Sequence, residues 1–159
     1  MPVFDLYLPL FWQRIGIALV CGGIIGLERR LRGKSAGILT SILICLGTEV
    51  FVALGTLITA DTVVHPLRVV LQVVTGIGLL GTGVNMAKES LVHGGTSAAV
   101  IWILAVIGSA IGLGYEYGGL ILALVTVGVL VGVDLLEAGL RLRDGILPPH
   151  PPFRRNRKR

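Results

Sequence analysis

Charged residues are scarce in this sequence: Asp, Glu, Lys and Arg make up 14% of its 159 residues, whereas soluble domains carry about 25%. Aromatic residues are also few, at 6%, while hydrophobic residues reach 53%. In water, so short a chain with so few polar groups has no means of covering its apolar surface. The composition therefore excludes an ordinary soluble domain and predicts an integral membrane protein.

Cysteine is almost absent, and the two that occur, Cys21 and Cys45, fall inside separate apolar runs. They lack the short spacing of metal ligands, so we interpret them as small packing residues. No Ser/His/Asp or HExxH pattern occurs either, and we expect neither an enzyme nor a cofactor. The net charge of +5 comes without an aromatic-basic surface, and we expect no nucleic-acid partner.

Long apolar runs are what the sequence does contain. Five weakly charged segments cover residues 8–26, 36–58, 69–86, 96–114 and 118–136. Each is close to the ~20 residues that a helix needs to cross a bilayer. Backbone polar groups in lipid must be satisfied within their own segment, so these segments are expected to be helices. The sequence predicts an all-α protein with five transmembrane helices in residues 1–140.

The flanking residues predict the orientation. If the N-terminus is outside, twelve of the fourteen Lys and Arg residues lie on the inner side. The positive-inside rule then predicts an N-out/C-in topology. Asp5 before the first run and Arg14 within it argue against a cleaved signal peptide. The proline-rich basic segment 141–159 is expected to be a disordered cytoplasmic tail.

A glycine cluster in the third span has two interpretations. The segment contains the G-x-G-x-x-G spacing of a dinucleotide-binding turn, but no acidic residue stands about 20 positions further on. In a transmembrane helix, small residues three or four apart instead allow a neighbouring backbone to approach closely. We therefore predict that the third span lies at the centre of the bundle. The predicted helix-packing residues are Gly22, Gly26, Gly76, Gly78, Gly81 and Gly83.

Three stretches carry a family resemblance. GLERRLRGKSAG (26–37), RVVLQVVTGIGLLGTG (68–83) and GGTSAAVIW (94–102) resemble, in this order, three motifs of the MgtC/SapB family of bacterial inner-membrane proteins. The resemblance covers about residues 14–136. It implies a multi-pass protein of the bacterial inner membrane that is tied to magnesium limitation, acid stress or host survival. Longer members carry a soluble C-terminal domain, which we expect this chain to lack.

Three places depart from the family pattern. Residues 95–97 read Gly-Thr-Ser, where the family has Leu-Thr-Thr. Residues 38–40 read Ile-Leu-Thr, where the family usually has a residue followed by Arg-Thr, so a cationic side chain is missing. Glu49 stands where a small apolar residue is expected. The resemblance therefore does not by itself establish a magnesium transporter.

Residues 16–47 and 76–108 have a similar layout: a glycine-rich helix, a charged turn, a polar helix start and an apolar helix. We interpret them as a parallel repeat of two helical hairpins, to which the fifth helix is added. The second and fourth helices then begin at the cytoplasmic side, where backbone N–H groups and cations favour an anion site. Its candidate residues are Glu28, Arg29, Lys34, Ser35, Lys88, Thr96 and Ser97. The alternative is that these turns only cap their helices, with Ser35, Thr96 or Ser97 as N-caps.

Ionisable and polar residues also occur inside the spans. Glu49 lies deep in the second span, where an ionised carboxylate costs several kcal/mol. Arg14 lies at a similar depth and is the expected ion-pair partner, with Arg68 as the rival. One hypothesis is that these polar residues line a hydrated path through the bundle. The other is that they only form hydrogen bonds between helices. The residues concerned are Arg14, Glu49, Arg68, Gln72, Thr75 and Asn85.

Two acidic residues at the end of the fifth span are candidates for a metal site. Asp134 and Glu137 are three residues apart and share a helix face, which suits a hydrated Mg²⁺. Glu137 is also four residues before Arg141, and that ion pair is the alternative.

Two functions remain open at this point. The first is a regulatory or adaptive protein that lies in the lipid bilayer, forms a homo-oligomer and binds other membrane proteins. The second is the permeation of a small ion or metabolite along the intramembrane polar residues. The glycine faces motivate the first hypothesis, and Glu49 with Gln72 motivates the second.

Overall fold

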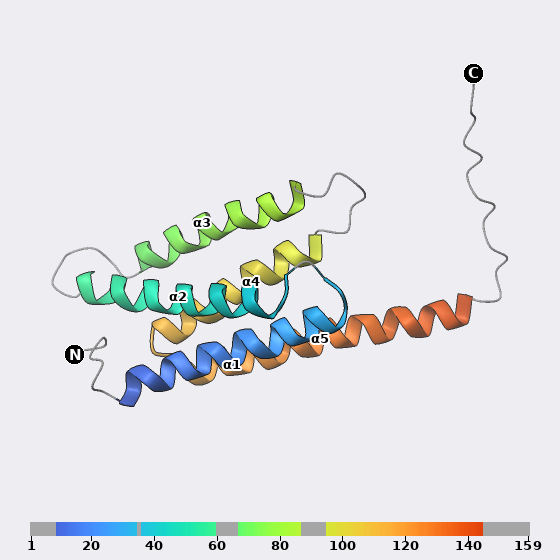
Figure 1. Cartoon of the computed structure of the whole chain (residues 1–159), viewed down its shortest axis with the longest axis horizontal. Coiled ribbons are helices and arrows are strands. Elements are labelled where there is room, and N and C mark those ends of the chain that lie inside the picture. The colour runs from blue at the N-terminus through green and yellow to red at the C-terminus, as the bar shows by residue number, and fades with distance from the viewer. Residues whose placement is uncertain (1–8, 35, 60–66, 87–94, 145–159) are drawn as a thin grey trace, which may run out of the picture. The chain divides into compact units, whose positions relative to one another are not determined.

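The computed structural model describes the backbone of residues 9–34, 36–59, 67–86 and 95–144. Within these residues the chain forms five helices and no strand. They are α1 (Pro9–Leu31), α2 (Ile38–Thr59), α3 (Leu67–Met86), α4 (Gly95–Gly112) and α5 (Glu116–Asp144), as Figure 1 shows. The predicted all-α class is confirmed.

The helices follow the predicted spans closely. Among the described residues, three stretches are long and apolar enough to cross a membrane: Pro9–Leu31, Ile38–Ile58 and Glu116–Leu136. Arg68–Leu80 and Thr96–Gly112 are shorter apolar helices. The G-x-G-x-x-G glycines lie within α3, so this spacing belongs to a helix and the dinucleotide-binding turn is excluded.

Two helices are longer than predicted. α1 continues past residue 26 to Leu31, and α5 continues past residue 140 to Asp144. In both cases the charged residues that had been assigned to a turn or a tail form further helical turns.

The chain divides into two compact units, Met1–Val127 and Gly128–Arg159. The described part of the second unit consists of the C-terminal portion of α5.

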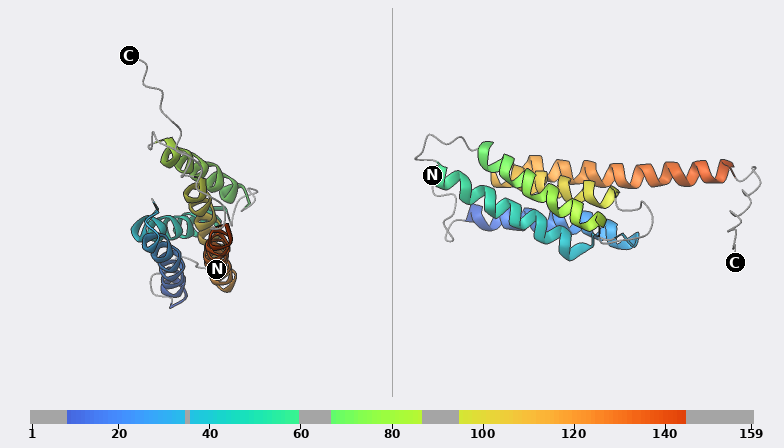
Figure 2. Two further views of the ribbon diagram at one scale, coloured as in Figure 1. Left: turned by 90° about the vertical axis from the view of Figure 1, so that its right-hand side faces the viewer. Right: turned by 90° about the horizontal axis from the view of Figure 1, so that it is seen from above.

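Within the first unit, α2 and α4 are the central helices. α2 packs against α1, α3 and α4, and α4 packs against α1, α2 and α3, as Figures 1 and 2 show. The prediction that the third span lies at the centre is wrong. Val73 is the one α3 residue that is buried among those whose side chains are described. The core lies instead between α1, α2 and α4, and includes Ala18, Cys21, Ile25, Cys45, Val52, Leu104 and Ile107.

Glycines bring α1 and α2 into close contact. A Cβ atom at Gly22 would lie 2.7 Å from the Cα of Ile42, and one at Gly26 would lie 2.6 Å from the Cα of Ile38. Because the residue number rises along α1 while it falls along α2, the two helices are antiparallel. Only a residue without a side chain permits this backbone approach.

The same device joins α2 to α4. Gly108 lies against the backbone of Cys45, and a Cβ atom at Gly112 would lie 2.6 Å from the carbonyl oxygen of Glu49. Along this contact the residue numbers of α2 and α4 rise in the same direction, so the two helices are parallel. The N-termini of these two helices therefore lie on the same side of the first unit.

Candidate functional site

Most of the buried polar side chains that the structure describes in the first unit lie at two places. The first is near the beginning of α1, where Nε of Arg14 lies 2.7 Å from Oε1 of Glu116 at the beginning of α5. The two side chains are 11% and 14% exposed. This ion pair holds the start of α1 next to the start of α5.

The turn between α4 and α5 makes room for this ion pair. Gly114 has a φ of 94°, and the N–H of Tyr115 donates to the carbonyl oxygen of Ala110 at 2.9 Å. This is the capping pattern in which a glycine with positive φ ends a helix. A Cβ atom at Gly114 would lie 3.2 Å from Nη2 of Arg14. Glycine is therefore needed here for the backbone conformation, and a Cβ atom would also be in tight contact with the arginine.

Glu49 is buried in the same region, and Arg14 acts on it electrostatically without forming an ion pair with it. It is 2% exposed, and its Oε2 has no hydrogen-bond partner in the described part of the chain. The ion pair of Arg14 is formed with Glu116, whereas the sequence had suggested Glu49. Ser109 of α4, 4% exposed, likewise has no hydrogen-bond partner for its hydroxyl among the described residues.

The remaining residues of the suggested path lie on α3. Arg68, Gln72 and Thr75 are exposed, and the Thr75 hydroxyl donates to the carbonyl oxygen of Leu71 in its own helix at 2.9 Å. The side chain of Asn85 falls outside the described residues. Among the residues whose side chains are described, the structure brings Arg14 together with Glu116 and leaves Arg68, Gln72 and Thr75 exposed on α3.

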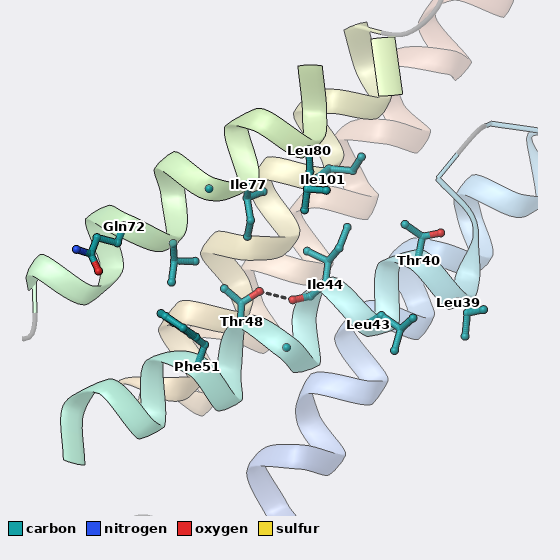
Figure 3. A pocket seen from close by; sticks show the side chains of 13 residues that line it. Leu39, Thr40, Leu43, Ile44, Thr48, Phe51, Gln72, Ile77, Leu80 and Ile101 are labelled. Carbon is teal, nitrogen blue, oxygen red and sulfur yellow. Dashed lines mark hydrogen bonds between the residues drawn. The ribbon is translucent and has the colours of Figure 1, made fainter. Parts of the chain in front are cut away.

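An apolar groove lies between α2 and α3, with α4 behind it. Its volume is about 640 Å³, and Figure 3 shows the side chains of α2 and α3 that face one another across it. The Thr48 hydroxyl donates a hydrogen bond to the carbonyl oxygen of Ile44 in its own helix, so the groove is mostly apolar. The lining residues are Leu39, Thr40, Leu43, Ile44, Gly47, Thr48, Phe51, Gln72, Val73, Gly76, Ile77, Leu80 and Ile101.

The second polar place is where α1 ends and α4 begins. Arg29 is 2% exposed, and its Nη2 donates to Oγ of Ser97 at 2.5 Å. Its Nε has no hydrogen-bond partner in the part of the chain that is described. Ser97 is the third residue of α4, which begins at Gly95. Ser97 therefore accepts from the arginine within the first helical turn and does not act as the N-cap.

The end of α1 holds Arg29 in place. The N–H of Lys34 donates to the carbonyl oxygen of Arg29 at 3.0 Å, and the N–H of Gly33 donates to that of Arg30 at 3.1 Å. Gly33 has a φ of 64°. This pair of hydrogen bonds with a left-handed glycine is the Schellman cap. It ends the helix at Leu31, one residue after the basic pair, and directs Arg30 and Lys34 outward, where both are exposed.

Glu28 and Ser41 complete the buried polar groups near Arg29. Oε1 of Glu28 lies 2.5 Å from Nε of Arg32, and its Oε2 has no hydrogen-bond partner within the described ranges. Ser41 of α2 is 0% exposed and also has no hydrogen-bond partner there for its hydroxyl. Its Oγ would lie 3.1 Å from a Cβ atom at Gly26. Sequence reasoning missed Ser41 because a lone serine in an apolar run gives no signal of its partners.

Of the other anion-site candidates, two are exposed and two lie outside the described residues. Thr96 is exposed in the first turn of α4, and Lys34 is exposed after α1. Ser35 and Lys88 lie outside the described residues. The structure therefore joins Arg29 to Ser97 and leaves the remaining candidates of this group separate or undescribed.

The predicted packing glycines also differ from one another. Gly22 and Gly26 lie against α2, whereas a Cβ atom at Gly76 or Gly78 would meet no atom within 4 Å. The surroundings of Gly81 and Gly83 are outside the described residues. The α1 glycines thus face a neighbouring helix, and the first two α3 glycines face open space.

The suggested metal pair lies on α5 in the second unit. Asp134 is partly buried, and the side chains of Glu137 and Arg141 are not among those described. No cluster of three or more His, Cys, Asp or Glu residues that suits a metal ion occurs in the described ranges.

The described part of the chain holds five apolar helices, three of them long enough to cross a bilayer, and a closely packed interior with ionisable residues. These features define a polytopic helical membrane protein. Comparison with known sequences identifies the family to which this membrane protein belongs. The chain belongs to the MgtC family, whose sequence model matches residues 15–138. The resemblance of the three motifs is confirmed.

Several relatives cover much of the chain. "Putative magnesium transporter YhiD" of Escherichia coli K12 is 39% identical over 115 residues, which are 68% of this chain and 54% of the relative. Protein MgtC of Brucella abortus 2308 is 38% identical over 61% of this chain and 40% of its own length. An uncharacterized protein of Haemophilus influenzae is 34% identical over 79% of this chain and 55% of its own. The chain thus spans about half the length of the curated relatives it matches. No solved structure matches it.

Proposed function

We propose that this MgtC family protein lies in the bacterial inner membrane and acts in adaptation to magnesium limitation or stress by binding another membrane protein. The observation that carries the proposal is the open apolar groove between α2 and α3, of about 640 Å³. Family membership supports the setting, since relatives carry the names MgtC and magnesium transporter. The proposal assigns no catalytic step to the chain.

The glycines of the groove favour a helix as its occupant. Gly47 of α2 and Gly76 of α3 line the groove, and a Cβ atom at either position would meet no atom within 4 Å. In lipid, helices associate through close backbone approach at small residues, because lipid tails are as apolar as the side chains. We assign the groove to a transmembrane helix of a partner protein. A helix of a second copy, in the homo-oligomer that the sequence suggested, is the rival occupant.

The arrangement of the polar residues argues against a conduit. Glu49 lies against Gly112 of α4, on the side of α2 that faces the core. Gln72 lines the groove and Thr75 satisfies its hydroxyl within α3. A hydrated path needs these groups around one continuous space, and they lie on different sides of the helices.

A groove-filling substitution tests the proposal. Gly76→Leu adds a side chain inside the groove, and Gly23→Leu is the matched control because a Cβ atom there also meets no atom within 4 Å, but outside the groove. Tagged full-length variants are purified from native membranes of cells grown in low magnesium. We expect a partner protein to co-purify with wild type and Gly23→Leu and to be lost with Gly76→Leu. Equal co-purification with all three would refute the proposal.

Permeation is the second candidate function, and one observation favours it. The Oε2 of Glu49 is buried without a hydrogen-bond partner in the described residues, and such groups inside membranes often mark ion pathways. This hypothesis expects Mg²⁺ flux into proteoliposomes that falls in Glu49→Gln and Arg68→Ala. Our proposal expects no flux above that of protein-free liposomes.

A further inference from the structure

We propose that the region where α1 ends and α2 and α4 begin binds a phosphate group that carries a hydroxyl. Its binding side chains are Arg29, Ser41 and Glu28. This site is separate from the groove and does not rest on the function proposed above. Three polar atoms, one on each of these side chains, are buried there without a hydrogen-bond partner among the described residues: Nε of Arg29, Oγ of Ser41 and Oε2 of Glu28.

Arg29 supplies the first donor. Its Nη2 is engaged by Ser97, and the cap at Gly33 fixes its backbone. Its Nε–H is left without an acceptor on a side chain that is 2% exposed. A buried donor that lacks an acceptor costs free energy. An oxyanion next to Nε would remove that cost.

Two helix N-termini provide the electrostatic setting. α2 and α4 are parallel, so their N-terminal ends lie on the same side, and Ser41 and Ser97 each lie in a first helical turn. The first N–H groups of a helix have no partner within it and carry a positive partial charge. This combination favours anions.

Ser41 supplies the second donor. It lies against Gly26 of α1, one turn before Arg29. Side chains in a helix lean toward its N-terminus, so the guanidinium of Arg29 extends over the turn that Ser41 contacts. The hydroxyl of Ser41 is fully buried and has nothing to donate to within the described ranges.

Glu28 restricts which functional groups the ligand can carry. It acts electrostatically on Arg29, and one of its oxygens is held by Arg32. The other oxygen can only accept a hydrogen bond. A ligand that suits all three groups therefore has acceptor oxygens and one O–H. Inorganic phosphate and phosphomonoesters keep such a hydroxyl near neutral pH, whereas sulfate does not.

The charges around the site favour the arrival of an anion. Arg30 and Lys34 are exposed next to the end of α1, and basic residues at a site raise the local concentration of anions. Two sources offer the required group: free inorganic phosphate and the phosphomonoester headgroup of phosphatidic acid. The test distinguishes them.

The first experiment uses the purified full chain in phospholipid-free detergent. Inorganic phosphate or sulfate is titrated at matched ionic strength, and the melting temperature and the phosphorus-31 line width are followed. We expect a saturable rise in melting temperature and line broadening with phosphate, and neither a rise in melting temperature with sulfate nor displacement of phosphate by it. The same melting measurement in nanodiscs with and without phosphatidic acid tests the lipid source.

Matched serine variants test the residues. Ser41→Ala and Ser109→Ala each remove a buried hydroxyl without a described partner, so a purely structural role predicts the same small effect for both. We expect phosphate affinity to fall about tenfold or more in Ser41→Ala, the effect of losing a hydrogen bond to a charged group. Ser109→Ala should keep wild-type affinity. Glu28→Gln should lose the preference for phosphate over sulfate.

Each outcome decides the proposal. A response to inorganic phosphate assigns the site to free phosphate, and a response to phosphatidic acid alone assigns it to a lipid headgroup. No response to either, equal responses to phosphate and sulfate in wild type, or wild-type affinity in a folded Ser41→Ala would overturn it. Because no partner protein is present, these results are independent of the groove.

Discussion

Nε of Arg14 lies 2.7 Å from Oε1 of Glu116, and this ion pair joins the beginning of α1 to the beginning of α5. Both side chains are largely withdrawn from the surface, and Gly114 leaves room for the guanidinium beside the turn. Removal of one partner from a buried pair leaves the other charge without compensation. The pair is therefore a point at which single and double substitutions have very different consequences.

A double-mutant cycle measures this pair. We expect Arg14→Ala and Glu116→Ala each to lower the free energy of unfolding in detergent by about 3 kcal/mol, and the double variant to lose much less than the sum. The control cycle combines Arg14→Ala with Glu49→Gln and should show a smaller coupling. A larger coupling to Glu49 would show that Arg14 pairs with Glu49 instead.

Close approach of α1 to α2 predicts a sharp contrast between neighbouring glycines. Gly22→Ala places a Cβ atom 2.7 Å from the Cα of Ile42, whereas Gly23→Ala meets no atom within 4 Å. We expect Gly22→Ala to destabilise the chain by about 1–3 kcal/mol and Gly23→Ala to be neutral or slightly stabilising, because alanine favours helices. Thermal unfolding followed by circular dichroism checks both. Equal melting temperatures would contradict the packing described for these helices.

The turn before α5 predicts a second glycine contrast. Gly114 has a φ of 94°, and an alanine in such a conformation costs about 1–2 kcal/mol. In α5, a Cβ atom at Gly118 would make an ordinary contact, 3.5 Å from the Cβ of Tyr115. We expect Gly114→Ala to lower the melting temperature and Gly118→Ala to leave it unchanged or raise it. The opposite order would mean that the turn has a different backbone.

The buried carboxylate of Glu49 leads to a prediction about stability. One of its oxygens is buried without a described hydrogen-bond partner, and replacing such a group with an apolar side chain of similar size is often stabilising. We expect Glu49→Met to raise the free energy of unfolding by about 1 kcal/mol and to leave partner co-purification unchanged. A strong loss of stability would indicate that the carboxylate is satisfied by a group such as bound water or an ion.

Much of the fold was predictable because hydropathy and length decide which segments form helices in lipid. Each of the five predicted spans corresponds to one helix. The end of α1 was less predictable. Glu28 and Arg29 suggested an exposed turn, yet both are buried within the helix because Arg29 bonds to Ser97, far away in sequence. A charge pattern says nothing about a partner supplied by another helix.

The candidate sites show the same limit. Arg14 and Glu49 were matched by their depth along the helix axes, but depth does not determine which side of a helix a residue faces, and Arg14 faces Glu116. The glycines of α3 suggested a central helix, but Gly76 faces open space. Small residues predict that close approach is permitted, and only the packing decides which faces are used.

Photo-crosslinking from the groove tests the central claim most directly. A photoreactive residue replaces Phe51 or Leu80, which line the groove, or Val20, which is 51% exposed on α1 outside it. The full chain is irradiated in native membranes of cells grown in low magnesium. We predict that Phe51 and Leu80 crosslink to the same partner membrane protein and that Val20 does not. Absence of adducts at both groove positions, adducts with copies of this chain alone, or the same adducts at all three positions would contradict the account.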